Sequence, residues 1–143
     1  MNFSRLAVAA SVAWVAFVII GYVVHSVLLT DLYARQASAL RPGGDAYPMY
    51  GFGAALVGFF AFAYAYAKGY EGGQGTQEGM RFGVLVALML ICFAAVWAYV
   101  VFPISGELAA MLAVDYVVEF AVYGMIVGAI YKPVERSRRR GAR

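Results

Sequence analysis

Four long apolar stretches, joined by short polar connections, set the pattern of this chain. They cover approximately residues 6–29, 48–67, 82–102 and 108–130. Each reaches the ~20 residues with which an α-helix crosses about 30 Å of hydrocarbon. Membrane β-strands are only ~9–11 residues long and alternate in polarity, which these stretches do not. The pattern therefore predicts an all-α integral membrane protein with four transmembrane helices.

Composition agrees with this fold class. Of the 143 residues, 64% are hydrophobic and 13% are charged, whereas a soluble domain carries about 25% charged residues. The first apolar stretch is longer than the ~7–15 residues of a signal-peptide core, so we expect it to be retained as a helix. We predict one four-helix transmembrane domain over residues 1–132, followed by a basic cytoplasmic tail over 133–143.

Lysine and arginine predict the orientation, because cytoplasmic loops carry an excess of them. With both termini in the cytoplasm, nine of the eleven basic residues lie on the cytoplasmic side, and only Arg35 and Arg41 lie on the other. The four helices then form two antiparallel hairpins. In the outer connection, a short interfacial helix could lie on the membrane surface over 32–40. The inner connection, 69–79, holds five glycines and is predicted to be flexible.

The tail is rich in arginine and contributes most of the excess positive charge behind the sequence pI of about 9.1. Residues 136–143 could attract anionic lipid, at ~1 kcal/mol per basic residue, or only anchor the topology. No domain remains that could bind a nucleic acid. The predicted partners are therefore the lipid bilayer and either further copies of this chain or the subunits of a membrane complex.

Two acids lie one helical turn apart inside the fourth stretch. A charged side chain at the bilayer centre costs ~2.5–3.5 kcal/mol, so such residues seldom face lipid and usually have a partner or a function. Helical spacing places two tyrosines on the same face of this stretch, and a tyrosine and the single histidine share a face of the first stretch at a similar depth. The predicted ligand or proton site consists of Asp115, Glu119, His25, Tyr22, Tyr116 and Tyr123.

Three roles stay open for this cluster. It could tie helices together, it could hold a ligand, an ion or a proton, or Glu119 or His25 could act as an acid or base in catalysis. We name no catalytic residue, and an enzyme is the least favoured of the three. The spacing of a His-Asp-Glu set is not diagnostic of a metal, so no metal site is predicted. A single histidine excludes bis-histidine haem within one chain, and Cys92 alone excludes a cysteine cluster; the cofactor is unknown.

The opposite face of the fourth stretch is a stripe of small residues, which allows another helix to approach closely. The stripe contains Ala113, Val117, Ala121, Gly124 and Gly128. We predict that it packs against a helix of the bundle or forms an oligomer interface.

The segment Gly21-Tyr22-Val23-Val24-His25-Ser26-Val27-Leu28-Leu29, followed by Asp31-Leu32-Tyr33, resembles the end of the first helix in small bacterial four-helix membrane proteins, the uncharacterised DUF1761-type group. The glycine-rich connection into Arg81-Phe82-Gly83, and Asp115 in the last helix, are similar to that group. The resemblance implies a four-helix protein of the bacterial cytoplasmic (inner) membrane and implies no activity.

We therefore predict a small accessory or structural membrane protein, or a self-associating bundle, in a bacterial inner membrane. The alternative is an oligomeric protein that handles a small solute, a proton or a lipid through Asp115, Glu119 and His25. The two predictions differ in what surrounds the two acids.

Overall fold

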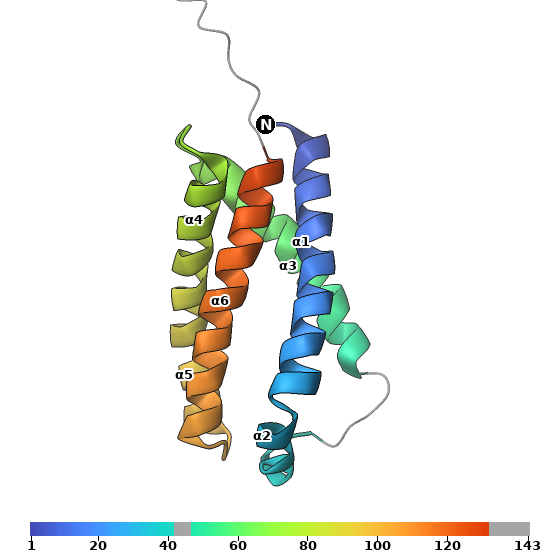
Figure 1. The fold of residues 1–143 in the computed structure, drawn as a ribbon, viewed down its shortest axis with the longest axis vertical. Helices are drawn as coiled ribbons and strands as arrows, with labels where there is room; N and C mark the ends of the chain where they lie inside the picture. Colours follow the sequence, from blue (N-terminus) through green and yellow to red (C-terminus); the bar gives the residue numbers. More distant parts are fainter. Residues whose placement is uncertain (42–46, 132–143) are drawn as a thin grey trace, which may run out of the picture.

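The computed structural model describes residues 1–41 and 47–131, and all of their regular structure is helical (Figure 1). Four helical spans are long and apolar enough to cross a membrane: Phe3–Leu28, Pro48–Gly69, Gly75–Val101 and Gly106–Ile130. The predictions of an all-helical chain and of four helices long and apolar enough to cross a membrane are confirmed, which is the pattern of a multi-pass membrane protein. The basic tail over 133–143, with its predicted lipid contact, lies outside the described residues.

Two of the four spans contain a π-helical turn. The first span comprises α1 (Phe3–Val23) and the π-helical turn η1 (Val24–Leu28). The third span comprises α4 (Gly75–Leu90), the π-helical turn η3 (Ile91–Ala95) and α5 (Val96–Val101). The second and fourth spans are single helices, α3 (Tyr47–Gly69) and α6 (Gly106–Ile130). In Figure 1, α6 lies between α1 and α4, and α3 runs slanted behind them. The N-terminus lies at the same end of the molecule as the end of α6.

The third span begins at Gly75, seven residues before the predicted start at 82. The prediction placed 75–79 in a loop because these residues are polar and rich in glycine. Tertiary contact with α6 stabilises a helix there in spite of the weak local propensity. The remaining loop, 70–74, is held by the Glu78 carboxylate, which accepts hydrogen bonds from the backbone N–H groups of Glu71 and Gly73.

α4 and α6 touch backbone to backbone along a row of glycines. The contacts pair Gly75 with Gly128, Gly79 with Gly124 and Gly83 with Phe120. A Cβ atom added to any of these three α4 glycines would lie only 1.9–2.3 Å from a carbonyl oxygen of α6. Residue numbers rise along one helix as they fall along the other, so α4 and α6 run antiparallel. Small residues let two membrane helices approach this closely and gain van der Waals contact.

α1 packs against α3 and α6 by setting small side chains against aromatic rings. Ala9, Ala10 and Ala13 of α1 are completely buried in a core that also contains Phe59 and Tyr66 of α3. The helices are also linked by a hydrogen bond, because the indole Nε1 of Trp14 donates to the backbone oxygen of Phe52 at 3.0 Å. The part of α1 from Ala9 to Trp14 is thus fixed against α3.

The predicted interfacial helix over 32–40 differs from what the structure contains. Two short elements replace it, α2 (Thr30–Ala34) and a 3₁₀ turn (Ala37–Ala39). Leu32 does not lie on the membrane surface: it is 6% exposed and packs with Leu29 and Leu108. Burial of these leucines folds the segment back over the end of the bundle.

A polar clamp then joins this segment to the start of α6. The Gln36 side chain accepts a hydrogen bond from the backbone N–H of Ser105 at 2.7 Å and also donates to the Ser105 hydroxyl. Ser105 is itself the N-cap of α6, where its hydroxyl accepts from the backbone N–H of Leu108 at 3.1 Å. The end of the first span and the beginning of the fourth are therefore held in register.

Candidate functional site

His25 lies in the π-helical turn η1, where the first span departs from α-helical geometry. The backbone N–H of Leu29 bonds to the carbonyl of Val24 at 2.8 Å, five residues earlier. Such single π turns inside helices occur frequently at functional sites, because the extra residue reorients a side chain. Here the turn carries the imidazole toward α6.

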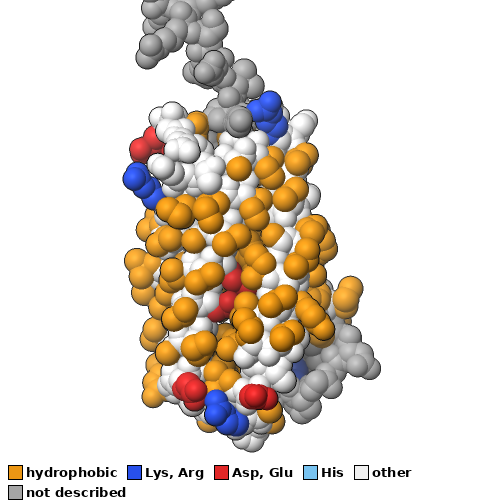
Figure 2. All heavy atoms as spheres, viewed as in Figure 1, with side chains coloured by type: hydrophobic (Ala, Val, Ile, Leu, Met, Phe, Trp, Pro, Cys, Tyr) orange, Lys and Arg blue, Asp and Glu red, His pale blue; other side chains and the backbone are white. Residues whose placement is uncertain are grey.

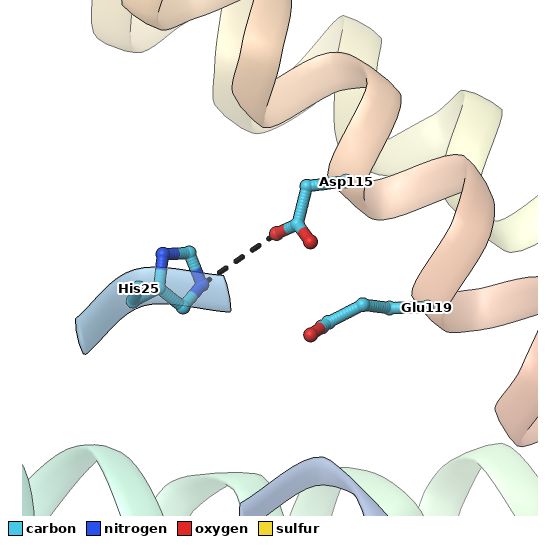
Figure 3. A group of neighbouring side chains, drawn as sticks. All are labelled: His25, Asp115 and Glu119. Carbon is cyan, nitrogen blue, oxygen red and sulfur yellow. Dashed lines mark ion pairs between the residues drawn. The ribbon is translucent and has the colours of Figure 1, made fainter. Parts of the chain in front are cut away.

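The two acids predicted from the sequence meet this histidine. Asp115 and Glu119 lie nine and thirteen residues after the start of α6 at Gly106, and Figure 3 shows both carboxyl groups pointing from α6 toward His25. The Nε2 atom of His25 lies 3.5 Å from Oδ2 of Asp115. One ligand atom from each of the three side chains can be chosen so that all three atoms lie within 4.8 Å of one another.

Both carboxylates are buried, and each keeps an oxygen without a hydrogen bond. Asp115 is 8% exposed and Glu119 is 4% exposed. Within the described part of the chain, Oδ2 of Asp115 and Oε1 of Glu119 have no hydrogen-bond partner. Buried polar atoms in folded proteins are nearly always satisfied, so such an atom needs a specific explanation. The cluster therefore has free acceptor capacity inside a low-dielectric environment.

Tyr33 holds the other side of the imidazole, and it was not among the predicted site residues. Its hydroxyl lies 2.7 Å from Nδ1 of His25. Burial, together with the negative charge of Asp115, raises the pKa of Tyr33 to about 12, so the phenol is neutral at ordinary pH. It donates to Nδ1 when the ring carries its proton on Nε2, and it accepts when Nδ1 carries the proton. The bond thus orients the ring in either case.

The three predicted tyrosines occupy different positions. Tyr22 lies outside the cluster, because it is 66% exposed. Tyr116 is half-buried with its ring against Phe120, at 6.5 Å between centroids. Tyr123 is completely buried one turn from Glu119, and its hydroxyl has no hydrogen-bond partner among the described residues. Tyr123 therefore adds a buried polar group beside the cluster, and Tyr22 does not.

Apolar groups close the cluster along the axis of the bundle. Toward the end that carries α2, the buried leucines Leu29, Leu32 and Leu108 pack together. In the other direction, Tyr123 contacts the rings of Phe17 and Phe59, with centroids 6.2 and 5.1 Å away. On the lateral face of the bundle, the His25 side chain is 39% exposed, and Figure 2 shows acidic atoms between apolar side chains about halfway along this face.

The predicted small-residue stripe divides into two parts. Gly124 and Gly128 contact glycines of α4, and the Cα of Ala121 would lie 3.3 Å from a Cβ on Gly83. Ala113 instead lines an apolar groove with Ala95 and Tyr99, and Val117 is 38% exposed. The glycine end of the stripe is therefore occupied by a helix of the same chain.

Comparisons of this chain with protein-family models, with curated proteins and with solved structures found no match. The resemblance to the DUF1761-type group stays a prediction. The described residues form an all-helical bundle with four spans long and apolar enough to cross a membrane, in which two buried carboxyl groups lie beside a partly exposed imidazole.

Proposed function

We propose that this chain is a small membrane protein that binds a small positively charged solute at His25, Asp115 and Glu119. The observation that supports this function most directly is the free acceptor capacity of the cluster. Two buried carboxylates each keep an oxygen without a hydrogen-bond partner in the described residues, and both point toward the same imidazole. A cation seated between them would satisfy these oxygens and compensate their charge.

A purely structural tie between helices is less consistent with this geometry. Such ties stabilise membrane proteins through satisfied hydrogen bonds, worth ~0.6 kcal/mol on average. Here the separation of 3.5 Å between His25 and Asp115 is longer than the ~2.7–2.9 Å of a charge-assisted hydrogen bond. The helices are already held by the α4–α6 glycine contact and by the Gln36–Ser105 clamp. The cluster is not needed for those contacts.

The membrane we propose is the bacterial cytoplasmic (inner) membrane, with both termini in the cytoplasm and the helices arranged as two antiparallel hairpins. The distribution of Lys and Arg supports this orientation, because nine of the eleven lie on the side that would then be cytoplasmic. In that orientation, His25 lies near the outer leaflet, three residues before the end of the first span at Leu28.

An accessory or self-associating subunit is the second candidate. The sequence feature that favoured this candidate is the small-residue stripe of α6. In the structure, Gly124 and Gly128 of this stripe contact α4, so these glycines do not require a second chain. A partner would bind elsewhere on the apolar surface of the bundle. Measurement of the oligomeric state in nanodiscs tests this candidate, and a stable oligomer that Asp115→Asn leaves intact would favour it.

The proposed function is tested by the thermal stability of the full-length protein in nanodiscs with a panel of cations. A ligand that binds only the folded state raises its stability by mass action. Na⁺, K⁺, Mg²⁺, Zn²⁺ and methylammonium would be compared on the wild type, on a double Asp115→Asn, Glu119→Gln variant and on Glu107→Gln, an exposed acid of the same helix. We expect at least one cation to raise the Tm of the wild type and of Glu107→Gln but not of the double variant. An equal response of all three proteins, or no response, would contradict the proposal.

A further inference from the structure

We infer that His25, Asp115 and Glu119 form a site for a divalent first-row transition metal ion, with zinc as the representative case. The inference rests on the proposed function and specifies its ligand. The sequence alone predicted no metal, because the chain separation between His25 and the two acids says nothing about their distance in space. The fold places a nitrogen and two oxygens together.

The first argument is the spacing of the ligand atoms. In a tetrahedral zinc site with bonds of about 2.0–2.1 Å, neighbouring ligand atoms are roughly 3.3 Å apart. Nε2 of His25 and Oδ2 of Asp115 are separated by 3.5 Å, which is close to that value. All three ligand atoms lie within 4.8 Å of one another, so closing of the side chains around an ion by at most about 1.5 Å per separation would reach the tetrahedral spacing. A fourth position stays open for water or a substrate group.

The second argument is the burial of the oxygens. Glu119 is 4% exposed and Asp115 is 8% exposed, and among the described residues Oε1 of Glu119 and Oδ2 of Asp115 have no hydrogen-bond partner. Two carboxylates and a neutral imidazole carry a charge of −2, which a divalent cation balances in a region where net charge is costly. A monovalent cation would leave one negative charge uncompensated.

The third argument is the contact behind the imidazole. Histidines that ligate metals nearly always hydrogen-bond through their other ring nitrogen, and this partner fixes the orientation of the ring. Nδ1 of His25 meets the Tyr33 hydroxyl at 2.7 Å, which leaves Nε2 free to face the acids. The combination of one imidazole and two carboxylates suits first-row ions such as Zn²⁺, Mn²⁺ or Fe²⁺ better than Mg²⁺ or Ca²⁺, which prefer oxygen ligands alone.

The test is a metal titration of the full chain, purified without a polyhistidine tag, stripped with a chelator and reconstituted in nanodiscs. Zn²⁺ binding would be measured by calorimetry, stoichiometry by elemental analysis, and Co²⁺ would report the ligand field by its visible absorption. We expect one ion per chain, at least tenfold weaker binding in Asp115→Asn, Glu119→Gln and His25→Gln, and wild-type binding in Glu107→Gln. Circular dichroism and gel filtration verify that each variant is folded.

Tyr33→Phe provides a variant that keeps all three ligands. Loss of an outer contact of this kind weakens metal binding by ~10–100-fold, so we expect one ion per chain with reduced affinity. No saturable zinc binding to the wild type, or binding that the three ligand variants leave unchanged, would overturn the inference. If zinc does not bind, but another cation of the thermal panel raises the Tm of the wild type and not that of the double Asp115→Asn, Glu119→Gln variant, the metal inference is overturned and the proposed function is supported. If no cation acts, both fall.

Discussion

Gly79 of α4 and Gly124 of α6 face each other with no side chain between them: a Cβ atom added to either residue would lie 2.0 Å from the carbonyl oxygen of the other. Only glycine allows the two backbones to approach this closely. A Cβ atom at either position would collide with backbone atoms, which cannot move aside as a flexible side chain can. The relationship explains how α6, which carries both buried acids, is fixed against the third span.

Replacement of Gly79 by alanine should therefore destabilise the protein. The added methyl group forces α4 and α6 apart, and overpacking of this kind costs about 1–3 kcal/mol. The matched control is Gly58→Ala on α3, where no neighbouring atom of the described residues lies within 4 Å of the added Cβ. There the better helix propensity of alanine should leave stability unchanged or raise it by up to ~1 kcal/mol. Unfolding of both variants in detergent measures the difference, and equal effects would contradict the close contact.

Removal of the Glu119 carboxylate should stabilise the cation-free protein. Burial of a polar group without a compensating hydrogen bond costs about 1–3 kcal/mol, and Oε1 of Glu119 is a buried oxygen without a hydrogen-bond partner among the described residues. We expect Glu119→Met to raise the unfolding temperature in the presence of a chelator. Glu107→Met, at a side chain 65% exposed, should change stability by less than about 1 kcal/mol. A clear loss of stability in Glu119→Met would instead favour a structural tie.

The Tyr33 hydroxyl should lose its proton at a higher pH than the hydroxyl of an ordinary tyrosine. Burial and the charge of Asp115 raise its pKa from 10.0 to about 12, so the folded state holds this proton more tightly than the unfolded state. The resulting stabilisation is present in full below pH 10 and is lost as the pH rises through about 12. A difference spectrum between wild type and Tyr33→Phe, recorded at 295 nm during an alkaline titration, isolates this residue. A tyrosinate signal that is complete by pH 11 would contradict the burial of Tyr33 against His25.

Trp14→Phe should weaken the packing of α1 on α3. The variant keeps an aromatic ring but loses the 3.0 Å hydrogen bond from the indole to the Phe52 carbonyl, worth ~0.6 kcal/mol on average in membranes and up to ~1.7. The chain has two tryptophans, and the other, Trp97, is 58% exposed. Trp97→Phe is thus the control and should leave the unfolding temperature unchanged. Equal shifts in the two variants would show that the loss comes from the ring and not from the bond.

Prediction from the sequence was most successful where the physical cause is local. Length and apolar composition alone define a span, because every backbone group in hydrocarbon must be satisfied within a helix. The third span was the exception at its start. The residues from Gly75 to Gly79 look like a loop by composition, and only their contact with α6 accounts for their helical structure.

The candidate site was predicted in part. The cost of burying a charge singled out Asp115 and Glu119, and helical depth suggested His25. The same reasoning chose Tyr22, since Tyr22 and His25 share a face when each residue advances by about 100°. The π-helical turn that begins at Val24 changes this angle, and Tyr22 is exposed. Tyr33 takes the position beside His25 because the chain folds back after Leu29, which no helical periodicity in the sequence indicates.

From the sequence alone it follows that the chain is helical, that four of its stretches are long and apolar enough to cross a membrane, and that two acids and a histidine lie within them. Those properties follow from local hydrophobicity and from the expense of charge in a bilayer. The separation of 3.5 Å between Nε2 of His25 and Oδ2 of Asp115, and the contact of the α6 glycines with α4 of the same chain, follow instead from the way in which the helices pack. Distances between helices depend on how closely their backbones pack, and packing is a property of pairs of surfaces rather than of either segment alone.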